Sequence, residues 1–342
     1  MDRKNFFVRV DTSSPGLRME LNDRCLLLGS CFAQHVGGRM AEEKLHAVVN
    51  PFGVLYNPES IFRALDLMAY YAETGRQRLE ETLFETEGTW RSWLFSTEFS
   101  YATREECLER LDRELQRAAD VLNGADLLML TFGTNHVYRL RGTNHCVANC
   151  HKQSAALFEE RELTVDEIVD EAAVLRRLMD RHPGLNIVMT VSPYRYAKYG
   201  FHGSQLSKAT LLLSVERMVK EYAPRCHYFP AYELLMDELR DYRFYAADML
   251  HPSEQAVDYV WQRFREDWMT EEARQFISEW EKARLSLAHR PISRMGETYR
   301  RFLENLQKEI DRLQRKYPNF AFQTERAEVR SRLDSLQDGI QY

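Results

Sequence analysis

The fold is decided by the stretch Cys25-Leu26-Leu27-Leu28-Gly29-Ser30-Cys31-Phe32-Ala33. Its first five residues form a short apolar run that ends at a glycine, which is typical of a buried parallel strand. Apolar residues then recur every four positions, at Phe32, Val36 and Met40, and predict a helix. The stretch therefore predicts a strand that turns directly into a helix.

The same alternation continues along the chain. Further strands are predicted at residues 46–49, 127–132, 187–191 and 227–230, and helices at 104–123, 164–181, 204–223 and 258–268. Thr164, with Glu167 three residues later, is a predicted helix cap. Alternating strands and helices predict a three-layer α/β/α fold with a parallel sheet, which we expect to span residues 1–269. Ligands of such sheets bind beyond the carboxyl ends of the strands.

Two segments depart from this pattern. Residues 77–101 are rich in aromatic residues and indicate an inserted hairpin or lid, or a satellite hydrophobic cluster. Residues 270–342 are charged and lack buried-strand runs, which predicts a helical C-terminal appendage or a partner-binding arm. Within it, Leu303, Leu306, Ile310 and Leu313 have the three-and-four spacing of a packed helix seam. Residues 295–316 are thus a candidate interface for a homo-oligomer.

Composition narrows the class of protein. Of the 342 residues, 44% are hydrophobic and 29% charged, so a sizeable core can be buried. The net charge of −6 argues against a dedicated nucleic-acid binder. No apolar run approaches the roughly 18–20 residues of a membrane span, and the patch Phe6–Val8 is too short for a secretory signal. The six cysteines show no disulfide framework and predict reduced thiols in the cytoplasm.

One candidate catalytic motif is Asp248-Met249-Leu250-His251-Pro252, which precedes the last predicted helix of the sheet domain. An Asp three residues before a His can hold one ring nitrogen through its carboxylate. The other nitrogen is then available as a general base. A surface His near a helix start is the structural alternative.

Two other motifs follow predicted strands. Ser30 and Cys31 lie at a strand-to-helix turn, where a nucleophile sits near the positive end of a helix. Asn135, in Thr131-Phe132-Gly133-Thr134-Asn135, and the backbone N–H of Gly53 are candidate donors to an oxyanion. Helix capping and turn formation explain these small residues equally well when each is taken alone. Their common place at strand ends favours one shared site.

These segments resemble, in the same order, the conserved blocks of the SGNH/GDSL hydrolase superfamily. The run Leu26–Ser30 with Cys31 is similar to the first block, Gly53 stands at the second, Gly133-Thr134-Asn135 is similar to the third, and Asp248–Pro252 is similar to the last. Residues 29–33 spell the signature of the GSCFA family, a bacterial branch grouped with that superfamily. The resemblance covers about residues 20–268 and implies an acyl-transfer chemistry with no cofactor and no metal.

The resemblance is imperfect at two positions. Aligned with Gly-Asp-Ser, the sequence places Cys31 at the nucleophile position and Ser30 where Asp usually stands. We favour Cys31, because a neighbouring His and a helix N-terminus both promote the thiolate form of a cysteine. His136 replaces the Asp that usually ends the third block, so Asn149 is a second candidate for the oxyanion donor.

Two further segments look like GSCFA-family features. They are Asn149-Cys150-His151-Lys152 and Ser192-Pro193-Tyr194-Arg195. Both are expected at the same sheet edge, where His151, Lys152 and Arg195 are candidate contacts to a polar or anionic substrate. A zinc site formed by His145-Cys146 and Cys150-His151 is disfavoured, because their spacing does not match the usual Cys-x2–4-Cys pair and a second distant pair is lacking.

We therefore expect a carboxylester hydrolase that acts on an acylated carbohydrate or a small metabolite. Cys31 or Ser30 attacks the carbonyl, His251 carries the proton and Asp248 orients His251. An acyltransferase that uses an acyl-CoA-like donor on the same fold is the first alternative. A non-catalytic binding or scaffold protein is the second.

Overall fold

The structure, a computed structural model, describes residues 8–14, 16–143, 145–289 and 296–337. Most of the patch Phe6–Val8, which bears on the predicted lack of a secretory signal, lies outside the described residues. The chain forms two compact units. The first comprises Met1–Met19, Asp23–Ala41 and His46–Trp268, and the second comprises Glu20–Asn22, Glu42–Leu45 and Met269–Tyr342.

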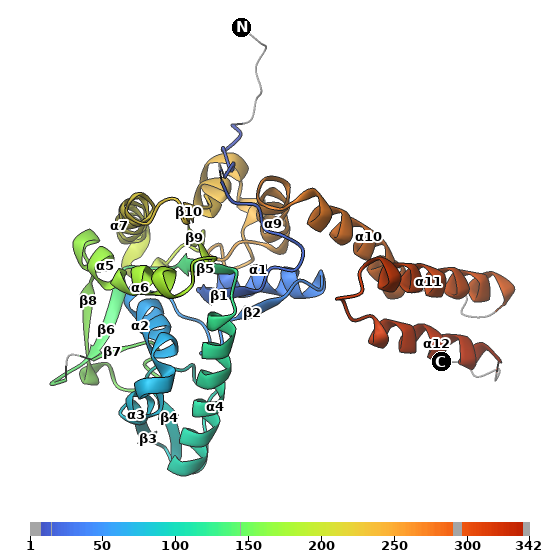
Figure 1. Ribbon diagram of the computed structural model, residues 1–342. Coiled ribbons are helices and arrows are strands. Elements are labelled where there is room, and N and C mark those ends of the chain that lie inside the picture. The colour runs from blue at the N-terminus through green and yellow to red at the C-terminus, as the bar shows by residue number, and fades with distance from the viewer. Residues whose placement is uncertain (1–7, 15, 144, 290–295, 338–342) are drawn as a thin grey trace, which may run out of the picture. The chain divides into compact units, whose positions relative to one another are not determined.

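The first unit contains a five-stranded parallel sheet (Figure 1). Its strands, in spatial order, are β2 (Ala47–Val49), β1 (Cys25–Gly29), β5 (Leu127–Phe132), β9 (Asn186–Val191) and β10 (Cys226–Tyr228). Gly29 pairs with Thr131, and Thr131 pairs with Thr190. The carboxyl ends of the three central strands are therefore in register, and the residues that follow them lie at one edge.

Helices cover both faces of the sheet, as the sequence predicts. Alternate strand residues, such as Leu26 and Leu128, join a core with helices α2 (Pro58–Ala69), α4 (Arg104–Asn123), α5 (Val165–Glu171), α6 (Ala173–Arg181) and α7 (Gly200–Glu221). Their neighbours, such as Leu27 and Met129, face α1 (Cys31–Glu42) and α9 (Glu254–Trp268). The first unit is thus a three-layer α/β/α fold.

Local sequence signals set several helix boundaries. The predicted helix over 104–123 has those bounds and begins after Thr103, whose side chain accepts a hydrogen bond from the Glu106 N–H. The capping box of Thr164 and Glu167 is present. The helix that it begins ends at Glu171, however, and a second helix starts at Ala173, so the single predicted helix over 164–181 is two shorter ones.

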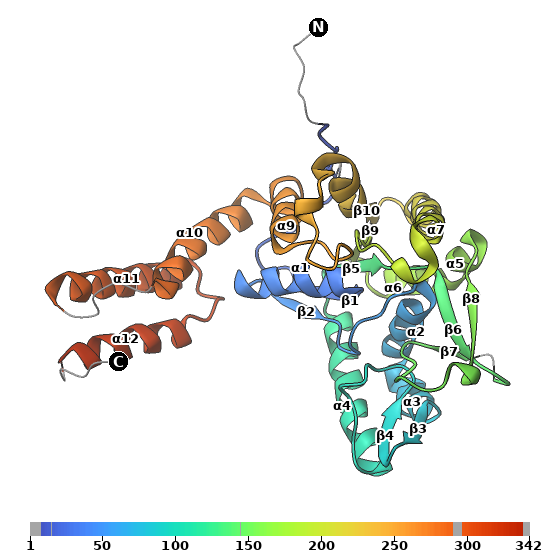
Figure 2. The ribbon, with the colours of Figure 1, turned by 180° about the vertical axis from the view of Figure 1, so that it is seen from behind.

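The aromatic segment after α3 (Arg76–Glu80) is both a hairpin and a hydrophobic cluster. Strands β3 (Leu83–Thr86) and β4 (Thr89–Ser92) pair antiparallel beside α4 (Figure 2). Phe84 stacks on Trp93 with ring centroids 3.5 Å apart. The aromatic residues that suggested an insertion therefore hold its hairpin together.

A second small sheet was not predicted. Strands β6 (His136–Leu140), β7 (Cys146–Val147) and β8 (Phe158–Glu162) form an antiparallel sheet in the order β7-β6-β8. In β8 one buried residue, Phe158, precedes four exposed charged residues. Such a strand has no apolar alternation for a sequence analysis to detect.

The second unit consists of helices α10 (Glu271–Ala288), α11 (Glu297–Lys316) and α12 (Gln323–Gln337) with two short N-terminal segments. Helix α11 packs against α10 and α12, and the predicted seam residues are buried, Leu303, Leu306, Ile310 and Leu313. Lys44 donates to the Ala321 carbonyl at 2.9 Å. The seam therefore packs inside this unit and is not an exposed face for a second copy; residue 295 of the proposed interface lies outside the described residues.

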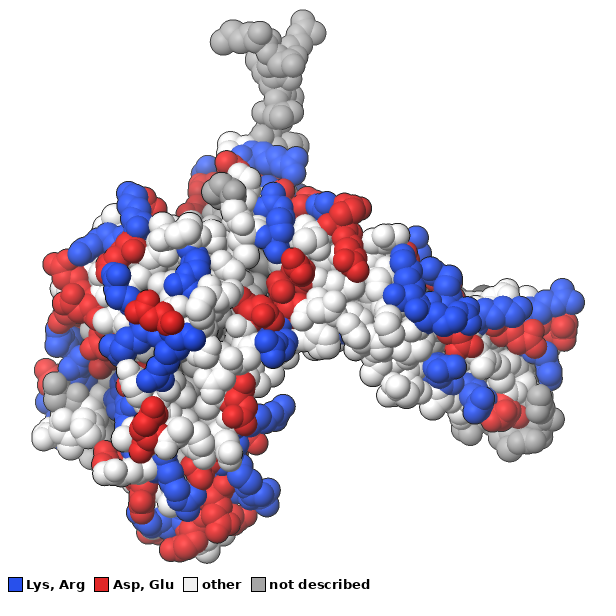
Figure 3. Space-filling model, in the orientation of Figure 1, with Lys and Arg blue, Asp and Glu red and all other residues white. Residues whose placement is uncertain are grey.

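The charge distribution and hydropathy agree with the composition. On the face of the first unit that Figure 3 shows, Lys and Arg side chains are interspersed with Asp and Glu. Among the described helices, none has the length and apolar composition that crossing a membrane requires.

Candidate active site

The turn after β1 exposes Cys31 and buries Ser30. A Cβ atom on Gly29 would lie 2.3 Å from the Thr131 carbonyl oxygen, so only glycine allows this approach of β1 to β5. The Ser30 N–H donates to the same carbonyl at 3.2 Å, and the Ser30 carbonyl accepts from the Ala33 N–H at 2.9 Å. Cys31 thereby becomes the first residue of α1 and is half-buried, whereas Ser30 is only 3% exposed.

The Cys31 thiol contacts a tyrosine. Its Sγ atom lies 3.6 Å from the Tyr56 hydroxyl oxygen. The Tyr56 carbonyl accepts hydrogen bonds from the N–H groups of Gly133 and Thr134, at 2.8 and 3.0 Å. The loop after β5 therefore holds Tyr56 against the thiol.

The turn before α9 holds His251 and Asp248 together. His251 Nδ1 lies 2.5 Å from Asp248 Oδ2, and Asp248 Oδ1 accepts from the N–H groups of Leu250 and His251 at 2.9 and 3.0 Å. The hydrogen bond with the His251 side chain, followed by these two backbone hydrogen bonds, lowers the pKa of Asp248 to about 2. Asp248 is thus a carboxylate that fixes the orientation of the imidazole.

Tyr194 packs beside His251. Its ring is 4.4 Å from the His251 ring, centroid to centroid. Burial, and then the charges of Asp248 and Cys31, raise the pKa of Tyr194. Among the described residues, no hydrogen bond joins the Cys31 thiol to the His251 Nε2 atom. Catalytic hydrogen bonds are often long in unliganded enzymes.

Two of the three predicted oxyanion donors have acceptors inside the fold. The Gly53 N–H donates to the Asn50 carbonyl at 2.8 Å. Asn135 is 2% exposed, and its Nδ2 donates to the Leu163 carbonyl at 2.9 Å. The Gly53 N–H and one of the two Asn135 amide N–H groups therefore already have acceptors, and the oxyanion roles of both residues stay predictions. Asn149 accepts from the His151 N–H at 2.7 Å, while its own amide N–H groups meet no acceptor in the described chain, so it stays a prediction.

Of the predicted substrate contacts, His151 is wrongly assigned. It is 2% exposed, with Nε2 2.9 Å from the Ser92 carbonyl oxygen and Nδ1 3.2 Å from Thr97 Oγ1. Burial lowers the pKa of His151, which favours a neutral structural ring. Cys146 is buried as well and contacts Ser60, and no three His, Cys, Asp or Glu side chains gather into a metal-binding group among the described residues.

Arg195 and Lys152, the other predicted substrate contacts, have different surroundings. The Arg195 guanidinium lies over the rings of Phe201 and Tyr245, 4.2 and 5.4 Å from their centroids. The Arg195 N–H donates to the Leu250 carbonyl at 3.0 Å, which ties this residue to the His251 turn. Lys152 is exposed. Neither cation forms an ion pair with any described carboxylate.

A buried lysine links two loops of the candidate site, and no sequence motif predicted this role. Lys208 of α7 is 2% exposed, and its Nζ donates to the carbonyls of Gly133 and Ser192 at 2.6 and 2.8 Å. Gly133 follows β5 and binds Tyr56, while Ser192 follows β9 and precedes Tyr194. Lys208 therefore joins the loop beside Cys31 to the loop beside His251.

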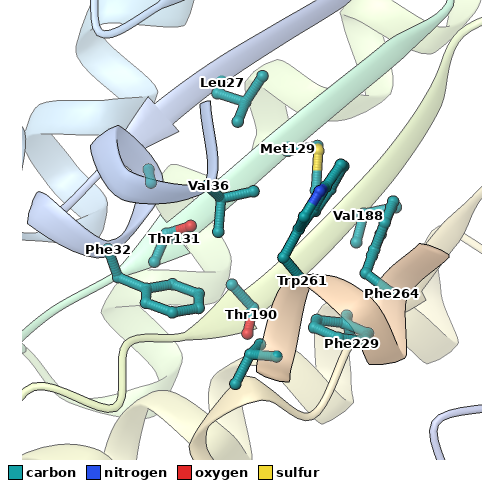
Figure 4. A pocket seen from close by; sticks show the side chains of 12 residues that line it. Leu27, Phe32, Val36, Met129, Thr131, Val188, Thr190, Phe229, Trp261 and Phe264 are labelled. Carbon is teal, nitrogen blue, oxygen red and sulfur yellow. The ribbon is translucent and has the colours of Figure 1, made fainter. Parts of the chain in front are cut away.

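A small apolar cavity lies next to the turn at Ser30 and Cys31, between the sheet and helices α1 and α9 (Figure 4). Its volume is about 20 Å³, and its lining includes Phe32, Thr131, Thr190 and Trp261. That volume is close to the minimum that holds one water molecule. The cavity is part of the apolar packing beneath the site.

A model of the GSCFA family matches residues 24–264, and one described as GSCFA domain protein, C-terminal domain, matches residues 280–335. No curated protein matches the sequence. The first match covers most of the chain and contains Cys31, Tyr56, His251 and Asp248, so the chain belongs to the GSCFA family.

Proposed function

We propose that this protein is a carboxylester hydrolase in which Cys31 is the nucleophile and the His251–Asp248 pair is the base. One observation supports the proposal: a half-buried thiol begins α1 directly after β1, and the turn that holds the carboxylate-bound imidazole is hydrogen-bonded to the loop after β9 through Arg195 and Leu250. The strand order 2-1-5-9-10 also supports an assignment to the SGNH superfamily, because it is the flavodoxin-like order.

The proposed reaction has two steps. His251 takes the proton of the Cys31 thiol, and the thiolate attacks the ester carbonyl. The intermediate collapses, the C–O bond breaks and the alcohol leaves with the proton from His251. Water, deprotonated by His251, then attacks the thioester and releases the acid and the free thiol. Asp248 stabilises the imidazolium in both steps.

Accessibility favours Cys31 over Ser30 as the nucleophile. The Ser30 hydroxyl is buried and has no hydrogen-bond partner among the described residues, so no described base is placed to activate it. Cys31, one residue later, is half-buried, and its side chain reaches the Tyr56 hydroxyl. A thiol at a helix N-terminus is also the more readily ionised group.

The surroundings favour a polar, anionic ester. Arg195 and Lys152 have guanidinium and ammonium donors without a carboxylate partner in the described chain. An acylated sugar acid, a phosphorylated ester or another small anionic metabolite would supply one.

Turnover of short-chain p-nitrophenyl esters tests the proposal. We expect Cys31→Ala and His251→Ala to lose nearly all activity, and Ser30→Ala to retain most of it. Cys150→Ala is the matched control, because Cys150 is the other half-buried cysteine among the described residues and lies outside the proposed triad. Equal rates for wild type, Cys31→Ala and His251→Ala would contradict the mechanism.

The thiol nucleophile also suits a second candidate function, acyl transfer from an acyl-CoA-like donor. Arg195 and Lys152, which have no carboxylate partner among the described residues, are suitable partners for the phosphates of such a donor. Acetyl-CoA consumption that requires a sugar acceptor would favour the transferase, and consumption without an acceptor would favour the hydrolase.

A further inference from the structure

The hydrogen-bond partner of Cys31 is a phenol that no sequence motif predicted. The Tyr56 hydroxyl and the Cys31 Sγ atom are 3.6 Å apart, and either can donate while the thiol is protonated. Once the thiol is ionised it has no proton to give, so the tyrosine is the only donor of the pair. The Tyr56 hydroxyl is therefore placed to donate to a Cys31 thiolate.

Tyr56 is held in place by its neighbours on both sides. The Leu55 N–H donates to the Gly29 carbonyl at 2.9 Å, one residue before the nucleophile turn. Asn57 caps α2 by accepting from the Ser60 N–H at 2.8 Å. A Cβ atom on Gly133 would come within 3.0 Å of the Tyr56 carbonyl oxygen, so the loop after β5 fits closely against this residue. The hydroxyl is thus directed to Cys31 by a rigid backbone.

The protonation state of Tyr56 suits a donor. Burial, and then the charge and hydrogen bond of Cys31, raise the pKa of Tyr56 well above its usual value of 10.0. The phenol consequently keeps its proton while the neighbouring thiol reacts. The Gly53 N–H and one Asn135 amide N–H already donate to carbonyls within the fold, whereas the Tyr56 hydroxyl lies beside the Cys31 Sγ atom.

We propose that Tyr56 is a catalytic residue whose hydroxyl donates a hydrogen bond to the Cys31 thiolate and then to the oxyanion that forms on attack. The second donor is the Cys31 N–H, which as the first N–H of α1 has no intrahelical acceptor. This assignment rests on the proposed hydrolase function.

No covalent bond of Tyr56 forms or breaks in the proposed reaction. The thiolate adds to the carbonyl carbon, the C=O electron pair moves to oxygen, and that oxygen accepts from the Tyr56 O–H and the Cys31 N–H. When the oxyanion collapses, the C=O bond re-forms, the C–O bond to the alcohol breaks, and the alcohol takes its proton from His251. Tyr56 keeps its own proton throughout.

Alkylation of Cys31 tests the contact without any substrate. The full-length protein is treated with iodoacetamide over a range of pH, and the rate at Cys31 is followed by peptide mapping in wild type, Tyr56→Phe and Tyr242→Phe. Tyr242 is 72% exposed and serves as the control. We expect the midpoint of the pH profile to move upward by roughly one pH unit in Tyr56→Phe alone, because a hydrogen bond to a charged group is lost. An unmoved midpoint overturns the proposal.

Ester turnover by the same variants tests the catalytic role. We expect kcat of Tyr56→Phe to fall by roughly 10²-fold with KM changed only a few-fold, since one oxyanion donor is removed. A shifted alkylation profile with unchanged kcat overturns the catalytic role and leaves only a contact. If wild type and Cys31→Ala hydrolyse esters equally, the proposed function fails instead, and the role of Tyr56 falls with it. Thermal unfolding of each variant confirms that Phe leaves the fold intact.

Discussion

Adjacent residues in the nucleophile turn have opposite environments. The backbone of Ser30 caps α1 and buries its hydroxyl, while Cys31 begins the helix and reaches Tyr56. Both were candidates in the sequence, since both stand at a strand-to-helix turn. Only the path of the backbone after Gly29 separates them, and that path depends on the contact of Gly29 with Thr131. This is why position alone left the choice open.

At the residue scale, Asp248→Asn tests the role of the carboxylate. We expect kcat to fall by about 10²–10⁴-fold, because the amide neither fixes the ring tautomer nor stabilises the imidazolium. Asp241→Asn is the matched control: Asp241 also accepts from a backbone N–H two residues later, that of Arg243, but holds no histidine. Steady-state ester kinetics measure both variants, and equal losses would show that only the turn matters.

The lowered pKa of Asp248 fixes the sign of one pH effect. A carboxyl whose pKa is about 2 in the folded state stays ionised at every pH above 4, against an ordinary value of 3.8. Its contribution to stability is therefore complete above pH 4 and is lost as the pH falls through about 2. Because Asp248 is ionised throughout the range from pH 8 to pH 5, we expect any loss of kcat in that range to arise from another group. The Asp241→Asn control should show the same loss. A pH–rate profile measures this.

At the element scale, two adjacent glycines of α1 provide a matched pair. A Cβ atom on Gly37 would lie 2.2 Å from Val49 Cγ2 on β2, whereas a Cβ atom on Gly38 would meet nothing within 4 Å. We expect Gly37→Ala to destabilise the fold by about 1–3 kcal/mol through overpacking. Gly38→Ala should stabilise it by about 0.5–1 kcal/mol, because alanine is the better helix former.

Urea unfolding of the two glycine variants gives the comparison directly. Equal midpoints for Gly37→Ala and Gly38→Ala would contradict the close packing of α1 on β2.

Lys208 of α7 also links two elements, because it binds the loop after β5 and the loop after β9. Lys208→Met removes the donor to the Gly133 and Ser192 carbonyls, at a cost of roughly 1–3 kcal/mol for each unsatisfied carbonyl. Burial lowers the pKa of Lys208 from 10.5 to about 7, so between these values the unfolded chain binds more protons than the folded one. Stability of the wild type should consequently rise with pH through this window.

Chemical unfolding at pH 7 and pH 10 checks this role of Lys208. A neutral amine still has two N–H groups for the two carbonyls, so the hydrogen bonds survive at the higher pH. We expect the stability difference between wild type and Lys208→Met to be larger at pH 10 than at pH 7. The opposite order would contradict a buried lysine with a lowered pKa.

Elements were predictable from the sequence where burial is continuous. The fully buried runs of β1 and β5 are typical of parallel strands. The predicted bounds of β5, residues 127–132, are those of the structure. The exposed, charged strand β8 carries no such pattern. Within the site, the order of the motifs predicted the shared edge, but hydrogen bonds such as Asn135 to Leu163 and Lys208 to Gly133 join distant segments. Local sequence does not encode those partners.

At the scale of the whole molecule, the chain forms two compact units. Ile310 of α11 is fully buried in the second unit. We expect Ile310→Ala to destabilise that unit by about 2–5 kcal/mol while ester turnover and Cys31 alkylation at 25 °C stay at wild-type rates. Thermal unfolding followed alongside activity measures both, and a parallel loss of activity would contradict the independence of the first unit's chemistry.

The most direct test of the central claim is to trap the acyl-enzyme. Wild type, Cys31→Ala and Ser30→Ala are mixed with p-nitrophenyl acetate, quenched in acid within one turnover and mapped by peptide mass spectrometry. Cys31 as nucleophile predicts an acetyl thioester on Cys31 in wild type and Ser30→Ala, and no acetyl group on residues 29–33 of Cys31→Ala. An acetyl group on Ser30, or ester turnover with no acetyl group on Cys31, would contradict it.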